Sequence, residues 1–334
     1  MTSAWKALVV NGTFYEVLDQ HAERIRLEGL HLLDEDAFRL TPARVHKLAE
    51  DVDVIFGPGA GLDAGLFERA RRLKVISIAA SGYESVALEA ATRAGVVVTN
   101  APTPLMNAAV ADLTFGLLVG LARSIPQNYH KLVQFGDADR PLGVLLNGKT
   151  LGIIGLGNIG KEVARRGGAF GMRLLAYELD RFWDERFAVR HSVQQVDLGT
   201  LLKESDFVSL HLRATPDTVG LLGVRELAQM KPTAYLINTA RASLVDRNAL
   251  YAALVSGRIA GLGSDVIMDG GLDKEMLSLP NVIGTRHLGN RSVEAVHEVM
   301  NTAIDNALAV LHGQRPSYVV NPQVFEASGK NEDH

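Results

Sequence analysis

Residues 151–178 read LGIIGLGNIGKEVARRGGAFGMRLLAYE, and this stretch decides the fold. Leu151–Ile154 is a short apolar run typical of a buried strand, and Lys161–Phe170 has a helical pattern. A G-x-G-x-x-G lies between them and consists of Gly155, Gly157 and Gly160. Its glycines permit, in order, a tight turn, close approach of the backbone to a pyrophosphate, and close packing of helix on strand. The stretch therefore predicts a strand–loop–helix unit that binds a dinucleotide, although such a loop alone is also found in ordinary strand–helix turns.

The residues around the glycine loop indicate which dinucleotide binds. The helix N-terminus, with Asn158 and Ile159, offers unpaired N–H groups and a partial positive charge to the phosphates. Glu178 lies at the end of the next predicted strand. A carboxylate there can accept hydrogen bonds from the adenine-side ribose and would repel a 2′-phosphate. We therefore expect NAD rather than NADP as the cofactor.

Short β-branched runs alternate with helical patterns along most of the chain. Such alternation is typical of βαβ units and parallel sheets. One series of strands precedes a long helical stretch near Asn107–Arg123 and a second series follows it, so we expect an α/β protein with two doubly wound parallel-sheet domains. The predicted strands are Ala7–Val10, Val52–Phe56, Lys74–Ala79, Val96–Thr99, Leu151–Ile154, Arg173–Tyr177, Phe207–Leu210, Ala234–Ile237, Leu262–Val266 and Val282–Gly284.

Length and composition exclude several classes of protein. A chain of 334 residues is long enough for about two domains. It has no cysteine, and its ten histidines show no zinc-site spacing, so we expect neither disulfides nor a metal. The formal net charge of −4 predicts no nucleic-acid partner. The longest apolar run, Val110–Ala122, contains Asp112 and is too short to span a bilayer, so we expect no membrane association and a cytoplasmic protein.

Polar residues follow three of the later predicted strands. Arg241 follows one strand, Asp265 the next and His287 the last. Ligands bind at the carboxyl ends of strands in an open parallel sheet. The planar guanidinium of arginine suits bidentate binding of a carboxylate, and histidine transfers protons near neutral pH. Each residue alone fits a structural role equally well, but their placement at successive strand ends favours a substrate site.

Five stretches of the chain resemble one family. They are ASGYESVALEAATRAGVVVTNAP (80–102), NAAVADLTFGLLVGLAR (107–123), NGKTLGIIGLGNIGKEVARR (147–166), LINTARASLVDRNALYAAL (236–254) and LPNVIGTRHLGNRSVEA (279–295). They are similar to the D-isomer-specific 2-hydroxyacid dehydrogenases, a family that includes D-3-phosphoglycerate dehydrogenase. The resemblance implies that residues 102–292 form an NAD-binding Rossmann domain, inserted into a flavodoxin-like substrate domain made of residues 1–101 and 293–334.

The same resemblance implies roles for individual residues. Arg241 would hold the carboxylate and 2-oxygen of the substrate, assisted by backbone N–H groups around Ser81 and Gly82. His287 would take the hydroxyl proton while hydride leaves C2 for the nicotinamide, and would return that proton in the reverse direction. Asp265 would hold the nicotinamide carboxamide. Two threonines would line the cofactor cleft, Thr215 and Thr239. Similar proteins are homodimers joined through the cofactor domain.

One segment departs from the family pattern. A glutamate that orients the catalytic histidine normally lies five residues after the nicotinamide-binding aspartate, but position 270 is glycine here. Either Asp269, or with less support Asp273, serves His287 instead, or the pair is broken. Without a carboxylate the imidazole would hold its proton less tightly, and reduction of a keto acid would weaken.

Other departures concern the substrate more than the fold. Arg286 stands where a proline usually precedes the histidine, and it would add positive charge beside the substrate and select a more acidic acid. Arg213 interrupts the usual His-Leu-Pro-Leu-Thr run and is interpreted as drift at a tolerant loop position. The alternative is a contact with the adenine ribose, which would slightly weaken the expectation of NAD over NADP. Ala242 and Glu84 are interpreted as drift at loop positions.

The sequence predicts an NAD-dependent oxidoreductase that interconverts a D-2-hydroxy acid and its 2-keto acid. Arg241 is the expected carboxylate clamp and His287 the expected acid and base, with Asp269 the expected carboxylate partner. Two alternatives follow from the glycine at position 270. One is a dinucleotide-binding regulatory protein, and the other is a non-redox elimination enzyme that acts on an acidic substrate.

Overall fold

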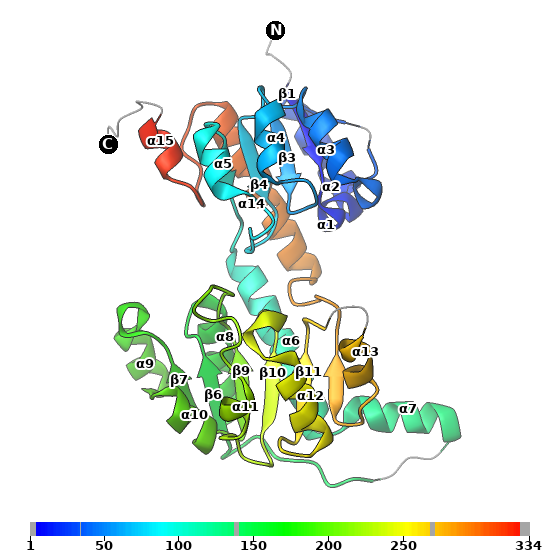
Figure 1. Ribbon diagram of the computed structural model, residues 1–334, viewed down its shortest axis with the longest axis vertical. Helices are drawn as coiled ribbons and strands as arrows, with labels where there is room; N and C mark the ends of the chain where they lie inside the picture. Colours follow the sequence, from blue (N-terminus) through cyan, green and yellow to red (C-terminus); the bar gives the residue numbers. More distant parts are fainter. Residues whose placement is uncertain (1–4, 34, 137–139, 268–270, 328–334) are drawn as a thin grey trace. The chain divides into compact units, whose positions relative to one another are not determined.

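The chain divides into two compact units. The computed structural model describes residues 5–33, 35–136, 140–267 and 271–327. Unit 1 comprises Met1–Met106 and Ser292–His334, and unit 2 comprises Asn107–Arg291 (Figure 1). The first boundary thus lies later than the expected residue 101. The N-terminus of the following helix stays with unit 1, because the Leu105 N–H donates to Glu298 Oε2 at 2.8 Å.

Unit 1 contains a five-stranded sheet in which every neighbouring pair is parallel. Its order is β2-β1-β3-β4-β5, in which the chain moves outward in both directions from β1. This is the doubly wound order of flavodoxin-like folds. Buried β-branched and aromatic residues fill the central strands, as parallel sheets covered on both faces require. The strands are β1 (Trp5–Val9), β2 (Leu30–Leu32), β3 (Val54–Gly57), β4 (Val75–Ile78) and β5 (Val97–Thr99).

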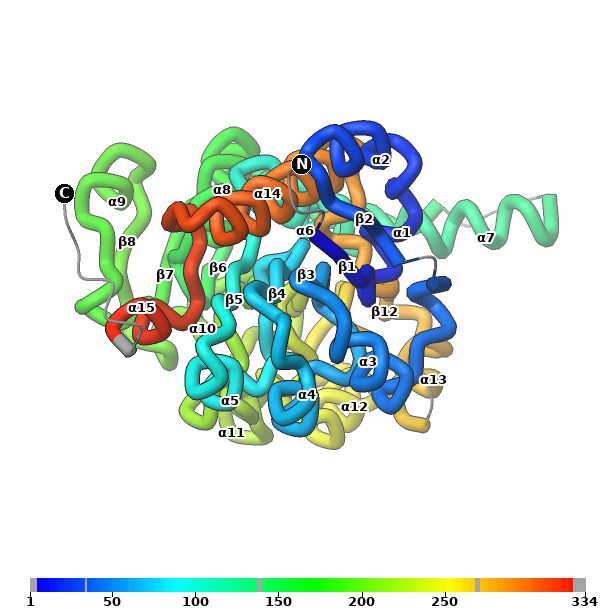
Figure 2. Tube along the Cα trace, turned by 90° about the horizontal axis from the view of Figure 1, so that it is seen from above, coloured from blue at the N-terminus to red at the C-terminus, as the bar shows by residue number. Residues whose placement is uncertain are grey.

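Helices cover both faces of this sheet. Figure 2 shows α2 and α14 on one face and α3, α4 and α5 on the other. Thr41 caps α3 by accepting from the Arg44 N–H, and Pro42 takes the first helical position, where its missing N–H and fixed φ are tolerated. The helices of unit 1 are α1 (Gly12–Glu16), α2 (Leu18–Leu27), α3 (Pro42–Ala49), α4 (Ala64–Arg69), α5 (Leu88–Arg93), α14 (Val293–Leu311) and α15 (Gln323–Ala327).

Unit 2 contains a seven-stranded parallel sheet of order β12-β11-β10-β9-β6-β7-β8. The chain starts at β6, moves outward to β8, and then crosses back to β9 on the other side of β6. The order therefore reverses between β6 and β9, as in a Rossmann fold. The strands are β6 (Thr150–Ile154), β7 (Arg173–Tyr177), β8 (Val193–Gln195), β9 (Phe207–Leu210), β10 (Tyr235–Asn238), β11 (Gly261–Ser264) and β12 (Val282–Gly284).

Two apolar cores enclose the seven-stranded sheet. One core joins the sheet to α6, α8 and α9, and the other joins it to α10, α11, α12 and α13. These faces make the three-layer arrangement that a doubly wound sheet requires. The helices are α6 (Pro104–Ala122), α7 (Ile125–Phe135), α8 (Asn158–Ala169), α9 (Glu185–His191), α10 (Leu198–Glu204), α11 (Val224–Leu227), α12 (Arg247–Val255) and α13 (Leu272–Leu277).

Helix α6 is the described helix that is long and apolar enough to cross a membrane by length and composition. Most of its most apolar window is buried inside the structure. Ala111, Phe115 and Leu118 belong to the same core as β6 and α8. The interior of the protein therefore accounts for the apolar character of this helix.

Candidate active site

Six neighbouring strands of unit 2 carry a predicted site residue just beyond their carboxyl ends. Because all seven strands are parallel, these ends lie along one edge of the sheet. The glycine loop follows β6, on the side where the strand order reverses, which is where ligands bind in open α/β sheets. In sheet order, the strands β12, β11, β10, β9, β6 and β7 are followed by His287, Asp265, Arg241, Thr215, Gly155 and Glu178.

The glycine loop has the geometry of a phosphate cradle. Gly155 adopts a φ of +96°, which a residue with a side chain rarely adopts. A Cβ at Gly160 would lie 2.1 Å from the Gly155 carbonyl oxygen, so only glycine fits there. A Cβ at Gly157 would meet no protein atom within 4 Å. Since α8 begins at the next residue, Asn158, the space over Gly157 faces the open N–H groups of a helix N-terminus and fits a pyrophosphate.

Glu178 lies directly after β7 and contacts the glycine loop. Its Oε2 accepts from the Leu156 N–H at 2.9 Å, and its Oε1 accepts from the Leu179 N–H at 2.9 Å. A carboxylate has about four acceptor positions, so it can still accept from a ribose hydroxyl. Glu178 also lines a cavity of about 440 Å³, within the size range of small-molecule sites. The residues around it fit the adenosine half of a dinucleotide.

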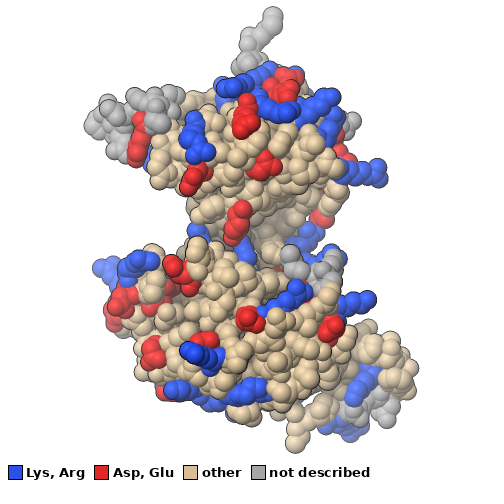
Figure 3. Space-filling model, viewed as in Figure 1, with Lys and Arg blue, Asp and Glu red and all other residues tan. Residues whose placement is uncertain are grey.

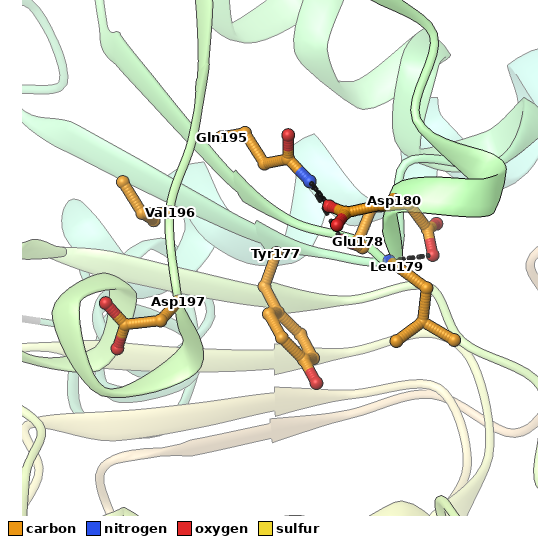
Figure 4. Close-up of a pocket in the computed structure, with 7 residues that line it drawn as sticks. All are labelled: Tyr177, Glu178, Leu179, Asp180, Gln195, Val196 and Asp197. Atoms are coloured by element: carbon orange, nitrogen blue, oxygen red, sulfur yellow. Dashed lines mark hydrogen bonds between the residues drawn. The ribbon is translucent and has the colours of Figure 1, made fainter.

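Three carboxylates line this cavity, and none of its lining residues is cationic. Figure 4 shows Gln195 pointing toward Asp180, and its Nε2 donates to Asp180 Oδ1 at 3.0 Å. Asp197 caps α10 at the same cavity, and hydrogen bonds from the Thr200 hydroxyl and N–H lower the pKa of Asp197. A 2′-phosphate would therefore meet concentrated negative charge here. The cavity is lined by Tyr177, Glu178, Leu179, Asp180, Gln195, Val196 and Asp197.

The buried Asn238 side chain shapes the loop that carries Arg241. Its Oδ1 accepts from the Ala240 N–H at 3.0 Å, and its Nδ2 donates to the Arg241 carbonyl at 2.9 Å. Asn238 thereby closes a tight turn immediately after β10. The guanidinium of Arg241 donates to the Ala240 carbonyl at 2.8 Å. The turn fixes the backbone from which the guanidinium extends.

Asp265 is buried, with a 2% exposed side chain, and its carboxylate contacts the segment after β12. Oδ1 accepts from the Thr285 hydroxyl at 2.6 Å and from the Leu288 N–H at 2.7 Å. Oδ2 accepts from the Gly289 N–H at 2.8 Å. The expected nicotinamide ligand is therefore hydrogen-bonded three times within the chain.

His287 lies within this same segment and is exposed. Its backbone φ is +56°, which is uncommon for a residue other than glycine. Its N–H donates to the Asp265 carbonyl at 2.9 Å. The histidine therefore projects from a turn that is anchored on the neighbouring strand end.

The two carboxylates considered as partners of His287 differ in what the structure shows of them. Asp273 lies on α13, is 6% exposed, and forms an ion pair with Arg247 Nη2 at 2.7 Å. Its carboxylate stabilises the contact between α12 and α13. Asp269 and Gly270 lie outside the described residues.

The two threonines expected near the cofactor lie after β9 and β10. The Thr239 hydroxyl is 2.9 Å from that of Thr114 on α6. Thr215 begins a turn in which its N–H donates to Thr218 Oγ1 at 2.8 Å. Thr215 therefore follows β9, the neighbour of β6, and Thr239 follows β10, the next strand of the sheet.

His211, directly after β9, has no role in the sequence-based prediction. Its N–H donates to the Ile154 carbonyl at 2.8 Å, which joins β9 to the end of β6. Its Nε2 is 2.8 Å from Ser209 Oγ, and burial lowers the pKa of His211 to about 3. The ring is neutral at pH 7, and the backbone of His211 holds the strand end from which the glycine loop departs.

The expected carboxylate-binding loop of unit 1 follows β4. Ser81 and Gly82 lie at the carboxyl end of that strand. Asn100 Nδ2 donates to the Ser81 carbonyl at 2.8 Å, and Asn306 on α14 donates to the Asn100 carbonyl at 3.2 Å. Two buried amides therefore hold the backbone of this loop.

Several residues that shape the site were not predicted. Asn238, Thr285 and His211 act through hydrogen bonds to the backbone of other segments, which a sequence pattern does not reveal. Gln195 and Asp197 were missed because β8, which ends at Gln195, was not predicted.

The distribution of charged side chains limits which ligands the protein can attract or hold. Figure 3 shows acidic and basic side chains interspersed on the visible face of each unit. An anionic substrate is then attracted by residues at the site rather than by the field of the whole protein. Among the residues that the structure describes, no group of three or more His, Asp or Glu is placed to hold a metal ion.

Known proteins match both the sequence and the fold. A family profile, D-isomer specific 2-hydroxyacid dehydrogenase, NAD binding domain, matches residues 115–289. Glyoxylate reductase of Thermococcus litoralis is 39% identical over 277 residues, covering 80% of this chain and 82% of that protein. Glyoxylate/hydroxypyruvate reductase B of Pectobacterium atrosepticum is 36% identical over 314 residues, covering 91% and 95%.

A solved structure matches in the same way. The NAD-complexed D-isomer specific 2-hydroxyacid dehydrogenase of Lactobacillus delbrueckii ssp. bulgaricus has a TM-score of 0.75 and 27% identity, covering 95% of this chain and 99% of that one. The glycine loop and the carboxylate-lined cavity described above fit the NAD that the family binds. The chain therefore belongs to the D-isomer-specific 2-hydroxyacid dehydrogenases and is an NAD-dependent member of that family.

Proposed function

We propose that the protein reduces a small 2-keto acid to the D-2-hydroxy acid with NADH, and catalyses the reverse oxidation. The observation that carries this proposal is the order of residues along one sheet edge. Arg241, Asp265 and His287 follow three adjacent strands, β10, β11 and β12, and the glycine loop follows β6 in the same sheet. An anion clamp, a proton donor and a dinucleotide cradle are the groups that this reaction needs.

The roles of the side chains follow from their chemistry. Arg241 binds the substrate carboxylate through its planar guanidinium and orients the 2-oxygen toward His287. His287 donates a proton to the carbonyl oxygen during reduction and removes it from the hydroxyl during oxidation. Backbone N–H groups around Ser81 and Gly82 assist in binding the carboxylate. Asp269 is the proposed carboxylate partner of the imidazole.

The cofactor is held by the glycine loop and the residues beside it. When bound, it supplies or accepts the hydride. Gly155, Gly157, Asn158, Ile159 and Gly160 hold the pyrophosphate through backbone N–H groups. Glu178 binds the adenine-side ribose, and the carboxylates of the adjacent cavity favour NAD over NADP. Three further residues are proposed to contact the nicotinamide half, namely Thr215, Thr239 and Asp265.

Glyoxylate and hydroxypyruvate are the first substrates to test, because relatives are named as glyoxylate and glyoxylate/hydroxypyruvate reductases. Arg286 directly precedes His287 and forms an antiparallel bridge with Val266. Arg286 would add a second positive charge to that of Arg241, and this favours an acid with a further negative charge, such as a phosphorylated or dicarboxylic keto acid. The substrate panel therefore includes both classes.

A homodimer in the cytoplasm completes the proposal. Helix α7 of unit 2 has no buried residue. It projects from the side of that unit in Figures 1 and 2. A helix with apolar residues and no core of its own is typical of a subunit interface. The exposed apolar residues of α7 are Ile125, Tyr129, Leu132, Val133 and Phe135.

The activity is tested by following NADH oxidation with the substrate panel. We expect at least one keto acid to be reduced by the native protein, and His287→Ala to reduce kcat by about 100-fold or more, as for the loss of a general acid. His31→Ala is the matched control, because this exposed histidine lies on the edge strand β2 of unit 1. Equal rates for the native protein and His287→Ala would disprove the proposal.

The same assay distinguishes the two alternatives. A regulatory protein would bind NADH with a fluorescence change but would show no turnover that depends on His287. An elimination enzyme would consume its substrate with no net change in NADH. Both alternatives rest on position 270, which lies outside the described residues.

A further inference from the structure

The segment 285–289 departs from β12 in an unusual way. It pairs antiparallel with the segment after β11, through a bridge between Val266 and Arg286. Two backbone hydrogen bonds fasten it there, from the Thr285 N–H to the Ser264 carbonyl and from the His287 N–H to the Asp265 carbonyl, both at 2.9 Å. The segment is therefore attached to its neighbouring strand end and is not a free loop.

The buried Asp265 carboxylate also holds this segment, through hydrogen bonds. It accepts from the Thr285 hydroxyl, the Leu288 N–H and the Gly289 N–H, at distances between 2.6 and 2.8 Å. These three donors flank His287 on both sides. Charge-assisted hydrogen bonds of this length are stronger than neutral ones, and a buried carboxylate that loses them is costly.

The conformation of His287 explains why such an anchor is needed. A φ of +56° at a residue with a Cβ is held in place only when its surroundings determine it. Leu288 and Gly289 come directly after the histidine, and both donate to Asp265. A Cβ at Gly289 would lie 3.1 Å from Asp265 Oδ2, so the glycine allows the backbone to approach the carboxylate closely.

We propose that Asp265 is a positioning residue, whose buried carboxylate holds the 285–289 turn and so aims the His287 ring. The inference rests on the proposed role of His287 in proton transfer. It goes beyond the expected contact of Asp265 with the nicotinamide carboxamide, because three of about four acceptor positions of the carboxylate are used within the chain. Thr285 shares this positioning role through its hydroxyl.

The test compares Thr285→Val, which removes one donor, with Thr285→Ser, which keeps the hydroxyl. Asp265→Asn is the stronger change, and the threonine pair keeps the test valid if that variant does not fold. We expect the Leu288 and Gly289 amides to exchange with deuterium at least about tenfold faster in Asp265→Asn, because an NH2 group that cannot accept replaces one carboxylate oxygen. Exchange should also be faster in Thr285→Val than in Thr285→Ser, because the carboxylate loses the hydroxyl that holds it in position.

Kinetics and cofactor binding provide the second part of the test. We expect kcat to fall by about 10- to 100-fold in Thr285→Val and Asp265→Asn, as for a misplaced catalytic group, with a changed pH profile. The NADH dissociation constant of Thr285→Val, measured by fluorescence, should stay within about twofold of the native value, and Thr285→Ser should behave as the native protein. In the His287→Ala background, Thr285→Val should cause no further loss of kcat.

Two results would overturn the inference. One is unchanged amide exchange at Leu288 and Gly289 in both Thr285→Val and Asp265→Asn. The other is a loss of NADH affinity in Thr285→Val that accounts for its whole kinetic effect. Failure of the proposed function is a separate result. It would appear as equal turnover by His287→Ala and the native protein, and this result does not depend on the amide exchange rates.

Discussion

Gly157 and Gly160 belong to one motif but are glycines for different physical reasons. The Gly160 position is closed by the protein itself, because the Gly155 carbonyl oxygen occupies the place of a side chain. The Gly157 position is open, and its φ of −70° suits any residue. Its glycine is therefore explained by a ligand that approaches the backbone, whereas that of Gly160 is explained by packing.

This difference predicts opposite outcomes for two alanine substitutions. Gly160→Ala should lower the free energy of unfolding by about 1–3 kcal/mol through overpacking, and should weaken NADH binding as well. Gly157→Ala should change stability by less than about 1 kcal/mol, as expected at a helix N-cap, yet weaken NADH binding by about tenfold or more. Urea unfolding and NADH fluorescence measure the two effects. Equal NADH affinity for Gly157→Ala and the native protein would contradict this explanation.

Cofactor choice is a second property of single residues. Glu178→Gln keeps the side-chain length and removes one of the three carboxylates of the cavity. We expect the ratio of kcat/KM for NADPH to that for NADH to rise by about tenfold, which corresponds to about 1.4 kcal/mol of relieved repulsion. Glu204→Gln is the control, because Glu204 pairs with Arg173 at the opposite, amino end of β7. An unchanged ratio in Glu178→Gln would assign the preference to other residues.

At the scale of elements, the strands of both sheets were predicted well where they are buried and apolar. Arg173–Tyr177, Phe207–Leu210 and Val282–Gly284 have the bounds expected from the sequence. Two strands were missed, β2 and β8, which have three residues each and lie at sheet edges. Their sequences, LHL and VQQ, lack the β-branched pattern by which the other two three-residue edge strands, β5 (VVT) and β12 (VIG), were predicted.

The candidate site could be predicted only in part from the sequence. Residues directly after long buried strands, such as Arg241 and Glu178, could be found from the chain because strand ends converge. The contacts that orient them could not. Whether Asp265 faces a cofactor or the turn at His287 depends on the path of residues 285–289, and a backbone φ of +56° at histidine has no sequence signature. Tertiary hydrogen bonds decide that path.

The junction of β9 and β6 should be sensitive to acid. The pKa of His211 is about 3 in the folded protein, against 6.5 when unfolded, so the unfolded state binds the proton more tightly. The stability that His211 contributes as a neutral ring is complete above pH 6.5 and is lost progressively as the pH falls toward 3. Between pH 7 and pH 5 the loss should be about 2 kcal/mol.

Urea unfolding of the native protein and of His211→Asn at pH 7 and pH 5 measures this loss. The variant should be less stable at pH 7, because the Ser209 contact is weakened, but should lose about 2 kcal/mol less between the two pH values. His31→Ala, at an exposed histidine, should follow the native protein. Equal losses of stability in the native protein and in His211→Asn between pH 7 and pH 5 would show that folding does not lower the pKa of His211.

At the scale of the whole molecule, each unit is an α/β layer structure with its own core. Helix α7 is the exception within unit 2, because it leaves apolar residues exposed while the other long helices bury theirs. Covering such a surface with a second copy gives a closed, symmetric assembly, whereas leaving it open favours aggregation. The interface of the proposed homodimer is therefore expected at α7.

Charge introduced on α7 should then separate the subunits. Leu132→Glu places a carboxylate in the centre of the exposed apolar residues of α7, and burying an unpaired charge there is costly. We expect the native protein to sediment at twice the 36.0 kDa of the chain, and Leu132→Glu to shift toward the monomer with its fold intact by circular dichroism. Val224→Glu is the matched control, since Val224 is an exposed apolar residue that begins α11 and lies outside α7. A native protein that sediments as a monomer would contradict the proposed homodimer. A Leu132→Glu variant that remains a dimer would place the subunit interface elsewhere, because a charge on α7 would then meet no partner subunit.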